Sequence, residues 1–221
     1  MKPLIIMGGG GHAKVITESL SLMGLEESII GFTALDGSVE LFNLSYIGDD
    51  SVILEYNKED ICLINAIGST GRNNIRKKLF EEFHERGFTF ANVTHPTAIL
   101  SKYVDIGESV QIMAGAIIQP GTRIGDNVIV NSGSRIDHDC IIGNHVHVSP
   151  GAILCGGVVV EDDVHIGAGA TVIQGITLGK GSIVGAGAVV IKDVLPHTTV
   201  VGVPAREVQK INGRLEKNTS E

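Results

Sequence analysis

The chain has 221 residues, a formal net charge of −8 at pH 7 and 43% hydrophobic residues. This charge disfavours nucleic acid as a partner, because a phosphate backbone is bound by a basic face. No apolar run approaches the ~18 residues of a membrane-spanning helix, and the apolar start of the chain stops at Gly8. We therefore expect a cytoplasmic protein with no membrane-inserted segment.

The first 94 residues predict a small α/β domain. Short apolar runs alternate with amphipathic segments, and this order favours a parallel sheet with helical crossovers. In the second expected helix, Ile75, Leu79 and Phe83 share one side. We expect strands at 3–7, 27–32, 61–68 and 88–93, and helices at 13–20 and 73–86.

A glycine-rich turn at 8–11, followed by His12, joins the first strand to the first helix. Glycines let the backbone approach a ligand, and a helix N-terminus offers free N–H groups to a phosphate. The turn and Ala13 also fit the loose dinucleotide fingerprint, with Asp36 about 25 residues further on. The domain has no room for a second mononucleotide half, so one nucleotide or a nucleotide sugar is favoured over a redox cofactor. A turn that serves only tight packing is the alternative.

From Leu100 to Val190 every sixth residue is aliphatic. A second series of small or aliphatic residues lies two positions earlier, from Val110 to Ala170, and glycine recurs beside the first series. A period of six fits neither a helix nor a long strand, but three such repeats make one triangular coil with the aliphatic side chains inside. We therefore predict a parallel β-helix of roughly five coils, each packed on the next. After it, a short polar helix is expected from Arg206.

His138 departs from this scaffold, because it occupies a corner where the repeat favours a small or turn residue. Asp137 and Asp139 flank it, and a neighbouring carboxylate can fix the tautomer of an imidazole and stabilise its charged form. Asn131 and His147 lie seven residues before it and nine after it. From spacing alone, a general base and a surface histidine are equally good interpretations. The sequence assigns no Ser-His-Asp or Cys-His nucleophile, and the histidine spacing does not favour a metal.

The repeat, an aliphatic residue followed by glycine and then a small residue, resembles that of the hexapeptide-repeat acyltransferases, which implies a left-handed β-helix. The whole chain resembles the bacterial sugar acetyltransferases grouped with sialic acid O-acetyltransferases, especially members that acetylate the 4-amino group of a nucleotide-linked deoxyamino sugar. The resemblance implies a Rossmann-like nucleotide-sugar-binding domain at 1–94. It implies a left-handed β-helix acyltransferase domain with a C-terminal tail at 95–221. The stretches that carry it are Gly8–His12, Ala66–Gly68, Asn74–Lys78, Asn131–His138, Ile142–Ser149 and Val201–Ala205.

Position by position, the resemblance implies roles for individual residues. His138 matches the general base, and Asp139 matches the orienting carboxylate that close relatives supply as glutamate. Asp137 is the alternative partner of the imidazole. Contacts with acetyl-CoA are implied at His147, Ala168 and Ala186. Contacts with the substrate are implied at Gly10, Gly11, His12, Asp36, Gly68 and Asn131.

The implied activity is acetyl-CoA-dependent N-acetylation of a UDP-, dTDP- or GDP-linked 4-amino sugar, for surface-glycan or protein-glycan synthesis. The amine attacks the thioester directly, and no metal is expected. The implied assembly is a homotrimer with its active sites between subunits. The first alternative is O-acetylation of sialic acid or a related sugar, and the second is a non-catalytic hexapeptide-repeat protein.

Overall fold

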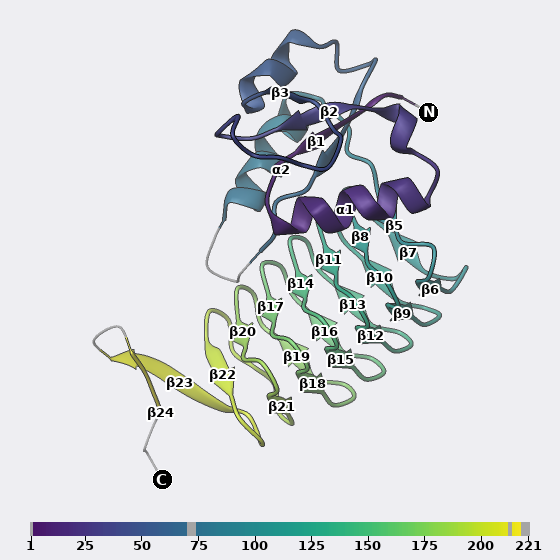
Figure 1. Ribbon diagram of the computed structural model, residues 1–221. Helices are drawn as coiled ribbons and strands as arrows, with labels where there is room; N and C mark the ends of the chain where they lie inside the picture. Colours follow the sequence, from purple (N-terminus) through teal and green to yellow (C-terminus); the bar gives the residue numbers. More distant parts are fainter. Residues whose placement is uncertain (1, 70–73, 212–213, 218–221) are drawn as a thin grey trace. The chain divides into compact units, whose positions relative to one another are not determined.

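The computed structural model describes residues 2–69, 74–211 and 214–217 (Figure 1). The chain divides into two compact units, residues 1–96 and 97–221. The first is an α/β unit, and the second is a parallel β-helix. Within the described residues, no helix combines the length and the hydropathy needed to span a bilayer.

The first unit is built on a four-stranded parallel sheet in the order β3-β2-β1-β4, which confirms the predicted parallel sheet. The central strand β1 is buried along its whole length, as expected of a continuous apolar run covered on both faces. The elements of this unit are β1 (Leu4–Met7), α1 (Gly11–Leu22), the 3₁₀ helix η1 (Glu26–Ser28), β2 (Ile29–Thr33), β3 (Tyr46–Gly48), the 3₁₀ helix η2 (Asp50–Glu55), β4 (Cys62–Asn65), α2 (Ile75–Glu85) and β5 (Val93–Thr94).

The side that helix α2 packs against the core agrees only in part with the side expected from the sequence. It begins at Ile75, and residue 73, its predicted start, lies outside the described residues. Its buried side chains are Arg76, Phe80 and Phe83, while Ile75 is 49% exposed. Of the three apolar residues expected on one side, Phe83 is buried and Leu79 packs against the apolar cluster, but Ile75 is exposed. Arg76 is buried as well, which apolar spacing does not predict.

The predicted strand at 88–93 is also corrected. Phe90 forms only an isolated bridge with Leu63, and the strand that follows is the two-residue β5. Phe88 and Phe90 are buried in the apolar cluster of this unit. The apolar character of the segment therefore reflects side-chain burial and not a long strand ladder.

In the second unit, each coil contributes one short strand to each of three faces. Strands pair in parallel with their equivalents one coil away, as Arg123 pairs with Ile141 and Ile141 with Val159. Face 1 contains β8 (Gln111–Ile112), β11 (Ile129–Val130), β14 (His147–Val148), β17 (His165–Ile166), β20 (Ile183–Val184) and β22 (Thr199–Val201). Face 2 contains β6 (Ile99–Leu100), β9 (Ile117–Ile118), β12 (Arg135–Ile136), β15 (Ile153–Leu154), β18 (Thr171–Val172) and β21 (Val189–Val190). Face 3 contains β7 (Asp105–Ile106), β10 (Arg123–Ile124), β13 (Ile141–Ile142), β16 (Val159–Val160) and β19 (Thr177–Leu178).

The core of the β-helix consists of the two series seen in the sequence. The every-sixth aliphatic side chains are buried from Ile112 to Val190, while Leu100 and Ile106 at the start are half-buried. The smaller series is buried from Val110 to Ala170. Burying one such Val, Leu or Ile side chain stabilises the fold by about 1.5–3 kcal/mol, so the repeat itself supplies the apolar driving force. The chain passes from face 1 to face 2 to face 3, and we call the corners between them edge 1–2, edge 2–3 and edge 3–1.

The predicted polar helix from Arg206 is wrong. The segment forms β23 (Arg206–Ile211), which pairs antiparallel with β22, and β24 (Arg214–Lys217) pairs antiparallel with β23. The backbone N–H and C=O groups at the edge of β22 are thereby paired with β23. A short helix in place of β23 would leave these groups without strand partners. Residues 218–221 of the predicted tail lie outside the described residues.

Candidate active site

His138 lies on edge 2–3, in the tight turn between β12 and β13. Its backbone N–H donates to Asp137 Oδ1 at 2.8 Å. Its ring Nδ1 lies 2.8 Å from Asp139 Oδ2. An ionised carboxylate only accepts hydrogen bonds, so Nδ1 carries the proton and Nε2 keeps a lone pair. Of the two carboxylates that flank His138, Asp139 therefore contacts the ring and Asp137 holds the backbone.

Asp139 reaches the ring because of its backbone conformation. Its φ is +58°, in the left-handed region, where the equivalent positions of other coils are Gly121, Gly157 and Gly175. A side chain in this region costs roughly 1 kcal/mol, which Asp tolerates better than most residues because it can hydrogen-bond locally. At this edge a carboxylate thus stands where three other coils have glycine, which marks the turn as a departure from its neighbours.

The surroundings of His138 suit a proton acceptor near neutral pH. The hydrogen bond to Asp139 raises the pKa of the His138 ring above its ordinary value, and the negative charge of Asp137 raises it further. The side chain is 62% exposed, so a reacting group can reach it from solvent. An imidazole held in one tautomer with its second nitrogen accessible is equipped to act as a general base.

The coil after His138 provides a support for its ring. A Cβ built on Gly156 would lie 2.7 Å from both Cε1 and Nε2 of His138, so the ring rests against glycine backbone. We did not predict this contact from the sequence. The 18-residue spacing between His138 and Gly156, which is one coil, was the signal that could have found it.

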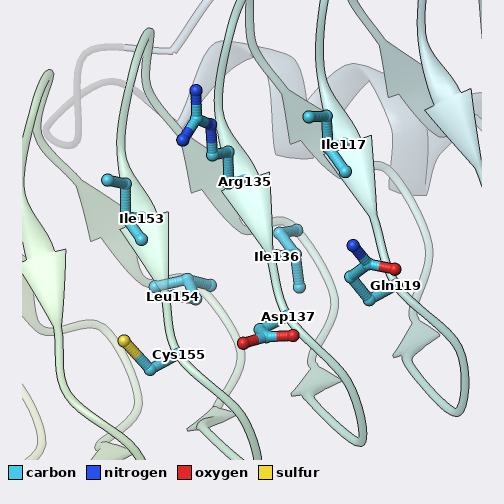
Figure 2. Close-up of a pocket in the computed structure, with 8 residues that line it drawn as sticks. All are labelled: Ile117, Gln119, Arg135, Ile136, Asp137, Ile153, Leu154 and Cys155. Carbon is cyan, nitrogen blue, oxygen red and sulfur yellow. The ribbon is translucent and has the colours of Figure 1, made fainter.

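A shallow hollow of about 290 Å³ lies on face 2, beside the edge that carries His138. Figure 2 shows Gln119, Asp137 and Cys155 in one row where the strands run toward edge 2–3. A second row, Ile117, Arg135 and Ile153, lies at the other end of the strands. The hollow thus joins apolar side chains to Asp137, the residue before His138.

A second group of predicted residues gathers at edge 1–2. Asn131 follows β11, and its Oδ1 accepts from the backbone N–H of Ser132 at 2.8 Å. Its Nδ2 is thereby left as the donor to His147 Nε2, 3.1 Å away. Ala168 and Ala186 are exposed at the same corner of later coils, where the Gly187 N–H donates to the Ala168 carbonyl at 2.9 Å. Because Nε2 of His147 accepts the hydrogen bond from Asn131, its Nδ1 carries the proton. His147 is 8% exposed.

One chain does not bring His138 and His147 together. His138 is on edge 2–3, whereas His147 is in β14 on face 1, beside edge 1–2. Asn131, the hydrogen-bond partner of His147, is separated from His138 by residues 132–137, which run across face 2. The implied base and the implied acetyl-CoA contact are thus on different edges of the same β-helix.

The other histidines near His147 do not form a metal site. His165 pairs with His147 across β14 and β17, with ring centroids 5.0 Å apart and ring planes at 83°. Burial lowers the pKa of His165, so its neutral form is favoured. Within the described ranges, no three His, Cys, Asp or Glu side chains are grouped so that they could hold a metal ion.

In the first unit, the glycine turn lies at the carboxyl end of β1. The Gly8 N–H donates to the Thr33 carbonyl at 2.9 Å, which ties the turn to β2. A Cβ on Gly10 or Gly11 would meet no atom within 4 Å, so the space above both residues is open. Helix α1 begins at Gly11 with no acidic residue in its first turn and no side chain capping it. This combination suits a phosphate group, which backbone N–H groups at a helix N-terminus bind.

Gly68 and His12 lie side by side at this turn, while Asp36 forms its hydrogen bonds beyond β2. A Cβ on Gly68 would lie 3.4 Å from Cβ of His12, so these two residues are neighbours. Asp36 is exposed beyond β2 and accepts from the N–H and hydroxyl of Ser38 at 2.9 and 2.7 Å. These hydrogen bonds lower the pKa of Asp36, which keeps its carboxylate ionised.

Both parts of the chain match known protein families. Residues 3–83 match the PglD N-terminal domain. Residues 103–138, 121–156 and 139–174 match the bacterial transferase hexapeptide (six repeats). Residues 157–192 match the hexapeptide repeat of succinyl-transferase.

Solved structures match nearly the whole chain. PerB from Caulobacter crescentus, determined with CoA and GDP-perosamine, is 38% identical, with a TM-score of 0.85 over 94% of this chain and 97% of that one. The acetyltransferase domain of PglB from Neisseria gonorrhoeae FA1090 is 34% identical, with a TM-score of 0.87 over 94% of this chain and 100% of that one. The chain belongs to the hexapeptide-repeat sugar acetyltransferases.

A curated member of this acetyltransferase family is also similar. The UDP-N-acetylbacillosamine N-acetyltransferase of Bacillus subtilis (strain 168) is 39% identical over 119 residues, which are 52% of this chain and 52% of that protein. The match thus spans about half the length of this relative. Members of the acetyltransferase family combine a PglD-like N-terminal domain with a left-handed parallel β-helix, and both units of the chain have these folds.

Proposed function

We propose that the chain transfers the acetyl group of acetyl-CoA to the 4-amino group of a nucleotide-linked deoxyamino sugar, for surface-glycan or protein-glycan synthesis. One observation carries the proposal: His138 is exposed and its Nδ1 is held 2.8 Å from Asp139, so Nε2 is available as a base. The ligands and substrates named for PerB, for the PglB domain and for the Bacillus subtilis relative support the substrate class.

In the proposed reaction, the neutral amine of the sugar attacks the carbonyl carbon of the thioester. Nε2 of His138 accepts the proton that the amine loses as the C–N bond forms. The C–S bond then breaks, and coenzyme A leaves as a thiolate that takes up a proton. Asp139 stabilises the imidazolium through Nδ1, so the transferred proton costs less than it would on an isolated histidine. The route needs no covalent enzyme intermediate.

The two substrates are assigned to different units. We assign the nucleotide sugar to Gly10, Gly11, His12, Asp36 and Gly68, where open glycine backbone and a helix N-terminus without a side-chain cap favour a diphosphate. We assign the pantetheine arm of acetyl-CoA to the corner at Ala168 and Ala186, with His147 beside it. Asn131 is assigned to substrate contact at the same corner, where it also fixes the tautomer of His147.

We also propose a homotrimer with an active site between each pair of subunits. Asn131 and His138 are seven residues apart across face 2, which is up to roughly 23 Å at ~3.3 Å per residue. One acetyl group cannot contact both edges of a single β-helix. A neighbouring copy that presents its edge 1–2 to edge 2–3 of the first would bring His147 next to His138.

The proposal is tested by replacing the base. His138→Ala should lower acetyl-CoA-dependent thiol release by at least ~10²-fold, the usual contribution of a general base. The matched control is His197→Ala, because His197 is an exposed histidine at a turn of the same β-helix. The size of each variant is compared with that of the wild type by light scattering. Unchanged turnover in His138→Ala would remove His138 from the mechanism, and a monomeric wild type would contradict the shared site.

The acceptor is tested with a panel of UDP-, dTDP- and GDP-linked 4-amino sugars and free sialic acid. We expect thiol release with at least one nucleotide-linked amino sugar and none with sialic acid. The opposite result would favour O-acetylation of sialic acid. Thiol release with neither class of acceptor would favour a non-catalytic role.

A further inference from the structure

We propose that Arg76 is a positioning residue for the nucleotide-sugar site: its buried guanidinium holds the backbone of residues 65–67 against the glycine turn. The inference rests on the proposed function, because it takes the turn at 8–12 and Gly68 as that site. Arg76 lies on α2, and no step of the proposed mechanism uses it.

The hydrogen bonds between Arg76 and Asn65 run in both directions. Nη1 of Arg76 donates to the backbone carbonyl of Asn65 and, at 2.9 Å, to that of Ile67. In return, the side-chain Nδ2 of Asn65 donates to the backbone carbonyl of Arg76 at 2.8 Å. Both accepting carbonyls lie at or beyond the carboxyl end of β4, where its pairing with β1 stops. A single side chain thus ties α2 to the loop after β4.

The cost of burying Arg76 indicates that its donors are needed. The side chain is 4% exposed and Asn65 is fully buried. Burial lowers the pKa of Arg76 to about 9, so the guanidinium stays protonated at neutral pH. An apolar residue would pack α2 on the sheet without the cost of burying a charge. Only a hydrogen-bond donor can hold the two carbonyls that Arg76 holds.

The loop held by Arg76 is in contact with the glycine turn. A Cβ built on Gly8 would lie 2.6 Å from Cδ1 of Ile67, so the Ile67 side chain packs on bare glycine backbone. Gly68 is next to His12. The Ala66 N–H also donates to the Met7 carbonyl at 2.9 Å. Any shift of residues 65–68 is therefore transmitted to the turn at 8–12.

This arrangement predicts a selective kinetic effect. The nucleotide-sugar contacts are assigned to the first unit and the acetyl-CoA contacts to the β-helix. Loss of the Arg76 hydrogen bonds should therefore raise KM for the nucleotide sugar and leave KM for acetyl-CoA unchanged. A purely structural role would reduce the amount of folded enzyme, and so the apparent kcat, without changing either KM.

The test compares Arg76→Lys and Arg76→Gln with Arg86→Lys. Arg86 is a matched control at the end of the same helix, 48% exposed and paired with Glu82 at 3.1 Å. For Arg76→Lys we expect KM for the nucleotide sugar to rise about tenfold, because the lysine ammonium ends one bond short of Nη1 and cannot hold both carbonyls as the guanidinium does. KM for acetyl-CoA should stay at the wild-type value, and Arg86→Lys should match the wild type in both. An equal change in both KM values, or in neither, would overturn the proposal.

A second measurement needs no substrate and separates this inference from the proposed function. Hydrogen–deuterium exchange of the free protein should be faster at residues 65–68 and 8–12 in Arg76→Lys, with exchange in the β-helix unchanged. If no nucleotide amino sugar is a substrate of the wild type, the proposed function fails while this measurement still tests the positioning role. Arg76→Lys is the variant measured first because it retains the buried charge. Exchange at wild-type rates in both segments of this variant would overturn the positioning role.

Discussion

Gly156 and Gly157 are neighbours in the chain, yet alanine at each should change a different property. A Cβ on Gly156 would lie 2.7 Å from Nε2 and Cε1 of His138, whereas non-bonded carbon atoms settle about 3.5–4.0 Å apart. The imidazole must therefore move by roughly 1 Å. A displacement of this size at a reacting group costs on the order of 10²-fold in rate. The backbone of Gly156 is outside the left-handed region, so we expect Gly156→Ala to lower kcat about 10²-fold and leave Tm unchanged.

Gly157→Ala should do the opposite. Its φ is +68°, and a Cβ there would meet no atom within 4 Å. A left-handed alanine costs about 1–2 kcal/mol, and each kcal/mol lowers Tm by about 2–4 °C in a chain of this size. We therefore expect Tm to fall by about 2–8 °C while kcat stays at the wild-type value.

The assay combines thiol release at saturating acetyl-CoA and amino sugar with thermal unfolding of the same preparations. Full turnover of Gly156→Ala at an unchanged Tm would show that the ring does not act from its position on Gly156. An equal loss of turnover in both variants would show that the turn backbone matters and the ring contact does not.

Two more predictions concern titratable groups. Asp139→Asn removes the main cause of the raised pKa of His138, so the neutral base persists to lower pH. We expect the acidic limb of the kcat/KM profile to shift to lower pH, and turnover to be slower because the tautomer is no longer fixed. An acidic limb that stays in place would contradict this prediction. Burial raises the pKa of Cys140 to about 11, which leaves only ~0.1% thiolate at pH 8. Iodoacetamide should therefore leave Cys140 unlabelled until the protein is unfolded, as mass spectrometry would show, and rapid labelling of the native protein would refute the burial argument.

Much of the fold could be predicted because the repeat is local. The aliphatic series from Ile112 to Val190 forms the core of the β-helix, since a side chain that recurs every six residues returns to the same place in each coil. The parallel sheet of the first unit also follows from alternating strands and helices. The helix predicted from residue propensities at residue 206 was wrong. This polar segment pairs instead, as a strand, with the edge of β22.

The candidate site was only partly predictable. His138 was recognisable as a departure from the repeat, but the sequence left both flanking aspartates as its partner. The structure decides for Asp139, because a left-handed backbone aims its carboxylate at Nδ1 while Asp137 accepts from the backbone N–H. Arg76 could not be found at all, because a charged residue in a helix is ordinarily exposed.

The order of the residues was enough to establish the coil period, the inward side chains and the unusual histidine, since each depends on spacing within a few residues. Which atoms meet across coils or across the sheet was decided by the folded chain alone. Gly156 supports the ring of His138 from one coil away, and Arg76 holds carbonyls that lie eleven and nine residues before it. Such contacts depend on backbone directions and burial, which arise only when distant segments pack together.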